Sequence, residues 1–600
     1  MALCDCVVVG GSLGGVAAAL AIAKRGRTVC ITEETDWLGG QATSQGVSAL
    51  DEFWLVESFG ATAAYSQFRQ LIRQHYQEHT ILSDKGKAMQ KLNPGNAWVS
   101  KLCYEPRVGV AAIEAMLQPY VTSGQVRIFT GYRPLTAVTS QGRIEEVQVT
   151  RVTPLGDSDD TLTLRGPMVL DATELGDLLP LAGVDHVSGT QSVSDTGETH
   201  AYPGAAHPEW VQSFTYPFAV EFCPGENHTI PKPAGYEYFR DTQPYTFNLY
   251  YVHQGCKRFP VFPTGEVPKT FWNYRRLIDA ELFADAAYPN DIAMINWPGN
   301  DYDRQNLIDK PWAEQLRIRE EAKLLSLGLL YWLQTEAPRD DGGHGYPELK
   351  LRPDVMGTED GLSKYPYIRE SRRIRAEVTV REEDLARFAR PGQARARHFP
   401  DSVGLGAYFI DIHACSGGQR FNLDIKSAPH QVPLGALLAP GWSNFLPACK
   451  NIGVTHIANG AYRLHPGEWA VGEAAGSLAA FCLAHQMSPH QVRADQTLLR
   501  TFQLELVQAG VPLFWYSDVP DGHPAWEAVQ YLSAIGVVGP DPARLEFCPE
   551  IPVGDLACTW GRNLKKETGL DPTFIEVDPT SCTRQAWALA AYENLQRTRA

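Results

Sequence analysis

The chain has 600 residues, of which 44% are hydrophobic and 20% charged, and its formal net charge is −16. This length exceeds what one hydrophobic core supports and predicts two or three domains of an ordinary globular protein. The negative charge opposes general attraction to nucleic acid or anionic membranes, so we expect no nucleic-acid partner. The chain opens almost directly on a predicted strand, and its apolar helical stretches are too short to span a bilayer. We therefore expect no membrane span and a cytoplasmic location.

The first 34 residues carry the strongest pattern. Val7–Val9 form a short β-branched run that ends in glycine, and the stretch 16–23 favours a helix with small residues. The G-x-G-x-x-G places fall on Gly10, Ser12 and Gly15, and Gly11 and Gly14 lie between them. These glycines permit the tight turn and the close approach of a pyrophosphate to the start of the helix. A dinucleotide site is predicted, with an ordinary strand-to-helix turn as the alternative.

A second strand over residues 28–32 ends at Glu33, 23 residues after Gly10. A carboxylate at this distance accepts hydrogen bonds from the hydroxyls of an adenosine ribose. The same carboxylate disfavours a 2′-phosphate. We therefore predict that Glu33 binds the ribose of a dinucleotide without that phosphate.

The loop that follows, TDWLGGQAT over residues 35–43, contains Gly39 and Gly40. Together with the first motif it resembles the flavoprotein oxidoreductases that have a glutathione-reductase-type FAD fold, and among them the broad FAD-dependent oxidoreductase group. The resemblance implies bound FAD, an LGG loop that wraps the cofactor, and the approach of Gln41, Ala42 and Thr43 to the flavin. Disulfide reductases of this fold carry two cysteines here, and this chain has none. We therefore expect no disulfide reduction.

The next stretch is predicted to complete the first part of the cofactor domain. Residues 61–78 and 108–120 have helical spacing, and residues 126–129 and 144–152 have the pattern of strands, with a hairpin turn around 140–143. Residues 168–183, MVLDATELGDLLPLAG, predict a strand, a turn and a short helix. They are similar to the second FAD motif of the same flavoproteins, although Glu174 stands where a glycine is usual. The positions that fit this motif are Asp171, Ala172, Thr173, Gly176 and Asp177.

From about residue 187 to 400 the sequence is rich in aromatic residues and proline, with one clear helix at 312–335. We interpret this stretch as an inserted substrate domain. The run YPYIRESRR contains Arg369 and Arg372 beside Arg373 and Glu370. If helical, it would place Arg369 and Arg373 on one face, either as a salt-bridged scaffold or as a clamp for an anion near the flavin.

The chain returns to the cofactor domain near residue 404. Residues 408–418 predict a strand with Asp411 and His413 on one face, because the two are two residues apart. His413 could take a proton while a hydride moves to the flavin. The alternative is a core histidine with satisfied hydrogen bonds.

A closing segment follows at residues 451–483. It predicts a strand and then a helix over 469–483 whose start lies at Gly472. We expect Ala474 and Gly476 to pack closely there and the helix N-terminus to be directed at the cofactor. The preceding RLHPGEW run resembles the turn at the flavin face in the same flavoproteins. It makes Arg463, His465 and Glu468 a second predicted catalytic group, with loop bracing as the alternative for Arg463 and Glu468.

Residues 515–538 are similar to one S-layer homology repeat, which hints at a bacterial source, and residues 583–597 predict a final helix. The 12 cysteines include no C-x-x-C pair, so we expect free thiols and no metal site. A small helical C-terminal unit completes the chain.

The predicted fold is α/β. A discontinuous Rossmann-like FAD domain at 1–186 and 401–500 encloses an α+β substrate domain at 187–400, and a helical unit follows at 501–600. The predicted function is hydride transfer from an alcohol, amine or activated C–H of a small substrate to FAD, with electrons passed to an unidentified acceptor. The alternatives are a flavin monooxygenase, disfavoured because no second G-x-G-x-x-G is visible, and a non-catalytic scaffold.

Overall fold

The core of the molecule contains a five-stranded parallel sheet, and the glycine-rich turn follows the carboxyl end of its middle strand. The computed structural model describes residues 1–153, 156–251, 255–418, 422–539, 541–575 and 578–599. The sheet has the order β23-β8-β2-β3-β4. Its strands are β2 (Cys6–Val9), β3 (Val29–Glu33), β4 (Val126–Thr130), β8 (Met168–Asp171) and β23 (Phe445–Pro447). Short β-branched runs with both faces covered account for this architecture.

The two parts of this sheet come from distant parts of the chain. β23 pairs in parallel with β8, so that Phe445 lies opposite Val169 and Pro447 opposite Asp171. β8 in turn pairs with β2. The predicted discontinuous α/β fold is thus confirmed, while the predicted domain boundaries stay predictions.

Helices α1 (Leu13–Lys24) and α12 (His465–His485) cross at glycines. A Cβ on Gly472 would lie 2.0 Å from the Gly14 carbonyl oxygen, and one on Gly476 would lie 2.3 Å from the Ala18 carbonyl oxygen. The backbones therefore touch, which only glycine permits at these positions. The prediction that the helix starts at Gly472 is wrong, because α12 begins seven residues earlier, with a proline in its first turn.

A second, smaller sheet of order β1-β7-β6-β5 lies beside the parallel one. It contains β1 (Ala2–Leu3), β5 (Tyr132–Ser140), β6 (Arg143–Thr153) and β7 (Gly156–Arg165). β5 and β6 form the predicted hairpin, in which Ser140 lies opposite Arg143. The two predicted helices are α2 (Ala63–His79) and α4 (Pro106–Thr122), and the second motif ends in α5 (Leu178–Ala182).

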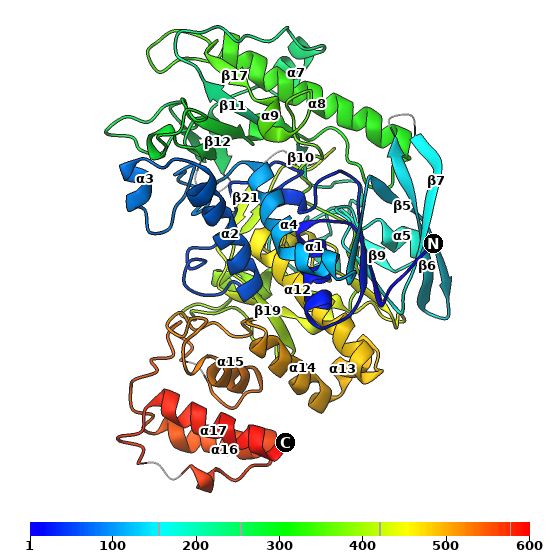
Figure 1. The fold of residues 1–600 in the computed structure, drawn as a ribbon, viewed down its shortest axis with the longest axis vertical. Helices are drawn as coiled ribbons and strands as arrows, with labels where there is room; N and C mark the ends of the chain where they lie inside the picture. Colours follow the sequence, from blue (N-terminus) through cyan, green and yellow to red (C-terminus); the bar gives the residue numbers. More distant parts are fainter. Residues whose placement is uncertain (154–155, 252–254, 419–421, 540, 576–577, 600) are drawn as a thin grey trace.

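The inserted region, in green at the top of Figure 1, has its own antiparallel sheet and hydrophobic core. The sheet order is β14-β15-β11-β17, with β11 (Phe218–Phe222), β14 (Arg276–Ile278), β15 (Ile292–Ile295) and β17 (Leu349–Leu351). Helix α8 spans Trp312–Thr335, as predicted. The other short elements here include α7 (Tyr236–Thr242), β12 (Asn248–Tyr251), β13 (Gly255–Arg258) and α9 (Pro353–Met356).

The arginine-rich run 365–373 is not helical, contrary to one predicted geometry. Tyr367 bridges Thr215 in extended backbone, and Arg373 begins β18 (Arg373–Ile374). Arg373 nevertheless forms a buried ion pair with Glu370. Extended backbone lets the side chains of Arg369 and Arg373 reach different surroundings.

The last hundred residues, in orange and red at the bottom of Figure 1, form a helical unit with a hydrophobic core of its own, and part of α14 and α15 also packs into the main core. Its helices are α14 (Gln496–Gln508), α15 (Trp526–Ala534), α16 (Leu556–Thr568) and α17 (Arg584–Arg599). Within the described ranges, none of the helices has both the length and the apolar run needed to cross a membrane.

Candidate active site

A pocket opens at the carboxyl ends of β2, β3 and β8. Eight of the predicted cofactor residues line it: Gly10, Gly11, Ser12, Glu33, Gly40, Ala172, Thr173 and Asp177. Its remaining lining residues are Thr32, Glu34, Ser44, Gln45, Tyr132, Arg133, Pro134, Glu174 and Tyr365. We call this the cofactor pocket. Its place, at the strand ends of a parallel sheet, is where open α/β sheets bind nucleotides.

The glycine turn is shaped by close contacts. Gly10 has φ +102°, and a Cβ there would lie 2.3 Å from the Ala172 carbonyl oxygen. Ser12 caps α1, because its Oγ accepts the N–H of Gly15 at 3.1 Å. The first turn of α1 contains no acidic residue. The positive end of the helix is therefore directed at the pocket without a built-in counter-charge from that turn.

Glu33 is held in place at the end of β3. Its Oε2 accepts the Gly11 N–H at 3.1 Å, and its Oε1 accepts the N–H and Oγ1–H of Thr35, each at 2.8 Å. Burial raises the pKa of Glu33 to about 7. Glycine turn, helix N-terminus and buried carboxylate together match the donors and acceptors that a dinucleotide requires.

Behind the turn, a buried ionic cluster joins three segments. Lys450 Nζ lies 3.0 Å from Glu468 Oε2 and also contacts Glu174. The other oxygen of Glu468 accepts the Gly14 N–H at 3.0 Å, and Gln41 Nε2 donates to Glu468 at 2.5 Å. Glu468 thus links the LGG loop, the glycine turn and α12. These contacts fit loop bracing, the alternative for Glu468, and its catalytic role stays a prediction.

The other predicted cofactor residues shape the pocket instead of lining it. Their contacts are with protein: the Ala42 carbonyl accepts from Tyr104, and Thr43 Oγ1 donates to the Leu38 carbonyl at 2.6 Å. The other predicted cofactor residues that do not line the pocket are small and pack closely against backbone or side chains: Gly14, Gly15, Gly39, Gly176, Gly472, Ala474 and Gly476. Gly472, Ala474 and Gly476 lie inside α12, where Gly472 and Gly476 face α1, and their cofactor binding stays a prediction.

A second pocket gathers three of the predicted catalytic residues, His413, Arg463 and Arg369, with Asp411. We call it the substrate pocket. Its other lining residues are Asp51, Leu249, Tyr274, Arg275, Asn296, Trp297, Pro298, Tyr367, Tyr408, Phe409, Asn422 and Asp424. It therefore combines charged groups with flat aromatic faces. The catalytic roles of His413, Arg463 and Arg369 stay predictions.

His413 lies between two carboxylates. Its Nδ1 is 2.7 Å from Asp301 Oδ2, and its Nε2 is 3.3 Å from Asp411 Oδ2. Although burial opposes ionisation, Arg369 and His413 hold the pKa of Asp301 at about 2. Asp301 is therefore ionised at neutral pH and fixes the ring by accepting the Nδ1 hydrogen. Nε2 lies beside Asp411, so each ring nitrogen of His413 has a carboxylate neighbour.

Each of the three arginines in the substrate pocket has a carboxylate partner. The N–O distances are 2.9 Å for Arg369 with Asp301, 2.8 Å for Arg463 with Asp411, and 2.9 Å for Arg275 with Asp51. Arg463 also donates to the Tyr367 hydroxyl at 2.8 Å. The guanidinium charges are thus largely compensated within the protein.

Two hydrogen bonds connect the pockets. Gln41 of the LGG loop donates to the Arg463 carbonyl at 3.0 Å. Gln45, which lines the cofactor pocket, accepts the Ile368 N–H at 3.2 Å, next to Tyr367 of the substrate pocket. Loop 40–51 therefore contributes lining residues to both pockets.

Two further predicted catalytic residues lie outside the substrate pocket. His465 is fully buried; its Nδ1 accepts the Asp51 N–H at 3.0 Å and its Nε2 donates to the Val47 carbonyl at 2.9 Å. Burial lowers the pKa of His465 to about 4, so the ring is neutral and braces loop 47–51. Arg372 binds Asp177 and Asp309 at 3.1 and 2.9 Å. Both side chains are engaged in contacts within the protein, and their catalytic roles stay predictions.

Sequence reasoning missed several lining residues. Asp51 and Arg275 are 224 positions apart and pair only in the folded chain. Arg275 follows the aromatic run FWNY, which gives no local signal of a partner at Asp51. Lys450, the cation of the buried cluster, was not singled out either. A lone lysine after a strand gives no local signal of its buried partners.

Residues 5–506 match the protein family described as FAD dependent oxidoreductase. The chain belongs to this family. FAD is therefore its cofactor, and the residues of the cofactor pocket fit that group. No curated protein sequence matches the chain.

Several solved structures align with all or part of the chain at low identity. The myxobacterial chondrochloren halogenase CndH aligns at 11% identity over 99% of this chain and 97% of that chain, with a TM-score of 0.30. A geranylgeranyl bacteriochlorophyll reductase-like protein from Thermoplasma acidophilum aligns at 10% identity over 96% and 99%, with a TM-score of 0.30. L-proline dehydrogenase from P. horikoshii aligns at 15% identity over 32% of this chain, with a TM-score of 0.15, and the aligned part spans 24% of that protein.

Proposed function

We propose that this FAD-dependent oxidoreductase is of the dehydrogenase or oxidase type and oxidises a hydroxyl-bearing carbon of a small, neutral, polyhydroxylated substrate in the substrate pocket. The observation that carries the proposal is the placement of His413 between Asp301 and Asp411 in that pocket, 2.7 and 3.3 Å away. The hydrogen bond from Gln41 to Arg463 connects this pocket to the LGG loop.

His413 supplies the proton chemistry. FAD, when bound, accepts a hydride from the substrate carbon. Loss of a hydride from an alcohol carbon requires that the hydroxyl proton leave as well, and a positioned histidine accelerates such transfers by about 10²–10⁴-fold. Asp301 fixes the ring through Nδ1, so Nε2 takes the proton from the substrate hydroxyl. Asp411 lies at the same nitrogen and stabilises the charge that develops on the ring.

The charge pattern selects the substrate class. A free carboxylate would have to compete with Asp301, Asp411 and Asp51 for the arginines they already bind. Hydroxyl groups do not need to displace these ion pairs, because paired guanidinium and carboxylate groups keep further donors and acceptors. Tyr274 and Trp297 add flat faces against which an apolar ring face can pack. These features favour a sugar-like or polyol substrate over a hydroxy acid.

The test is an anaerobic screen of the purified protein with its flavin, in which flavin absorbance reports reduction. Matched pairs are used: a neutral sugar or polyol and the corresponding sugar acid. We expect bleaching by the neutral member of at least one pair and much slower bleaching by the acid. Bleaching by acids alone would overturn the substrate class. Flavin reduction that requires NADH or NADPH, with an oxygen atom inserted into the substrate, would show a monooxygenase.

Two finer assignments are also proposals. The glutathione-reductase-type form of the FAD domain is supported by the glycine turn, Glu33 and the return of β23 to the sheet. The similarity of residues 515–538 to one S-layer homology repeat is supported by the helix α15 and the turn at Gly536. Loss of flavin binding in a Glu33→Ala variant with a native fold would support the first.

A further inference from the structure

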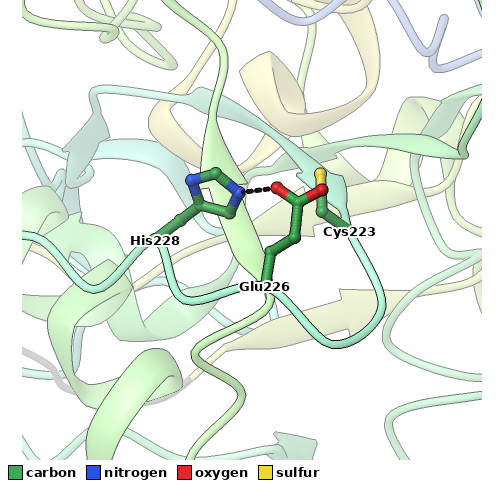
Figure 2. A group of neighbouring side chains, drawn as sticks. All are labelled: Cys223, Glu226 and His228. Carbon is green, nitrogen blue, oxygen red and sulfur yellow. Dashed lines mark hydrogen bonds and ion pairs between the residues drawn. The ribbon is translucent and has the colours of Figure 1, made fainter.

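A turn in the inserted region brings together three side chains that bind metals. Cys223 directly follows β11, and Glu226 and His228 follow within the next five residues. Figure 2 shows the three side chains converging on one point, with a hydrogen bond between His228 Nε2 and Glu226 Oε2 at 2.6 Å. The ligand atoms all lie within 4.8 Å of one another.

The backbone of this turn is fixed at both ends. The Cys223 N–H donates to the Glu348 carbonyl at 2.9 Å, and the His228 N–H donates to the Pro347 carbonyl at 2.8 Å. The Glu226 N–H closes the turn on the Cys223 carbonyl at 3.2 Å. The ligands are therefore positioned before any ion arrives, which lowers the entropy lost on binding.

The distances suit a tetrahedral ion after small side-chain movements. Zinc bonds of about 2.0–2.3 Å place neighbouring ligand atoms about 3.3–3.8 Å apart. The histidine and glutamate atoms, now 2.6 Å apart, need to separate slightly, and all three ligand atoms already lie within 4.8 Å of one another. Glu226 and His228 have room to do so, because their side chains are 62% and 26% exposed, while Cys223 is 4% exposed at the base.

A second group of possible ligands, Glu174, Cys449 and Glu468, shows what excludes a metal. Lys450 Nζ lies 3.0 Å from Glu468 and contacts Glu174, so an ammonium already provides the positive charge there. Glu226 and His228 form an ion pair with each other. Within the part of the chain that the structure describes, neither of them pairs with a lysine or an arginine.

We propose that Cys223, Glu226 and His228 form a binding site for a borderline divalent cation such as Zn²⁺, with water at the fourth position. One thiolate, one imidazole and one carboxylate are the ligands that zinc prefers, whereas a thiolate disfavours Mg²⁺ and Ca²⁺. The site lies on the inserted region and is independent of the flavin chemistry. The absence of a C-x-x-C pair concealed it, because only one of the three ligands is a cysteine.

The experiment measures zinc affinity of the tag-free full chain with its flavin, after removal of bound metal, by competition with a chromophoric chelator. We expect about one zinc per chain in the wild type and affinities about tenfold or more weaker in Cys223→Ser and Glu226→Gln. Cys256→Ser is the matched control, because Cys256 is an exposed cysteine on β13. The flavin spectrum checks that each variant is folded.

Cobalt provides a second readout that identifies the thiolate. Co²⁺ added to the wild type should give a thiolate-to-cobalt charge-transfer band in difference spectra, and the band should be absent in Cys223→Ser and retained in Cys256→Ser. Equal zinc affinity in the wild type and Cys223→Ser, or loss of binding only in Cys256→Ser, would overturn the proposal.

Discussion

The substitution Gly472→Ala separates a packing role of this residue from a cofactor-binding role. A Cβ on Gly472 would lie 2.0 Å from the carbonyl oxygen and 2.5 Å from the carbonyl carbon of Gly14, so it would overlap backbone atoms that have no rotamer with which to avoid it. Alanine favours a helix interior over glycine by about 1 kcal/mol. Overpacking against backbone costs about 3 kcal/mol. We therefore expect a net loss of about 2 kcal/mol from the contact between α1 and α12.

The assay is thermal unfolding of the protein with and without its flavin. A loss of this size lowers the first unfolding transition by roughly 4–8 °C, and the shift should be the same in both forms. Gly561→Ala is the matched control, because this glycine lies inside α16 and its Cβ would meet only Pro572 side-chain atoms, the nearest at 3.1 Å. A flavin-free Gly472→Ala protein that unfolds at the wild-type temperature would refute the packing role.

Two further variants test the buried polar groups. Lys450→Met leaves the carboxylates of Glu174 and Glu468 unpaired, so the free energy of unfolding measured with denaturant should fall by about 3–5 kcal/mol. The control is Lys566→Met, which should leave the midpoint unchanged because the side chain of Lys566 is 79% exposed. Equal unfolding midpoints for the two variants would contradict the stabilising role of the buried cluster. Burial lowers the pKa of His465 to about 4, whereas the pKa of a histidine in the unfolded chain is about 6.5. The neutral ring therefore contributes stability that is fully present above about pH 6.5 and is lost as the pH falls through about 4. This contribution is roughly 3 kcal/mol. Acid should therefore lower the free energy of unfolding less in His465→Gln than in the wild type. Parallel plots of that free energy against pH for the two proteins would contradict the prediction.

Local patterns predicted much of the fold. The run Val7–Val9 before glycine became β2, and residues 312–335 became α8 with the predicted bounds. The start of α12 was missed, although Pro466 in the first helical turn is a recognised start signal. The run containing Arg369 has helical spacing, but tertiary pairing of Tyr367 with Thr215 holds it extended.

The site was less predictable, because its contacts join distant residues. The glycine-rich turn and Glu33 were enough to locate the cofactor pocket from the sequence, because they belong to one βαβ unit. His413 and Asp411 were correctly expected on one face, yet Asp301, which orients the ring, comes from another strand, β16 (Asp301–Tyr302). His465 and Arg463 are neighbours in sequence, but the helix start between them directs one into loop 47–51 and the other into the substrate pocket.

The most direct test of the proposed chemistry is the single-turnover rate of flavin reduction by a neutral polyol that bleaches the flavin. The rate is compared between a C–H and a C–D substrate, in the wild type, in His413→Asn, and in the control His207→Asn, whose histidine pairs with Glu209 outside the pocket. We predict a slower C–D reaction in the wild type and a rate about 10²–10⁴-fold lower in His413→Asn with flavin still bound. Equal rates in His413→Asn and the wild type would contradict the account.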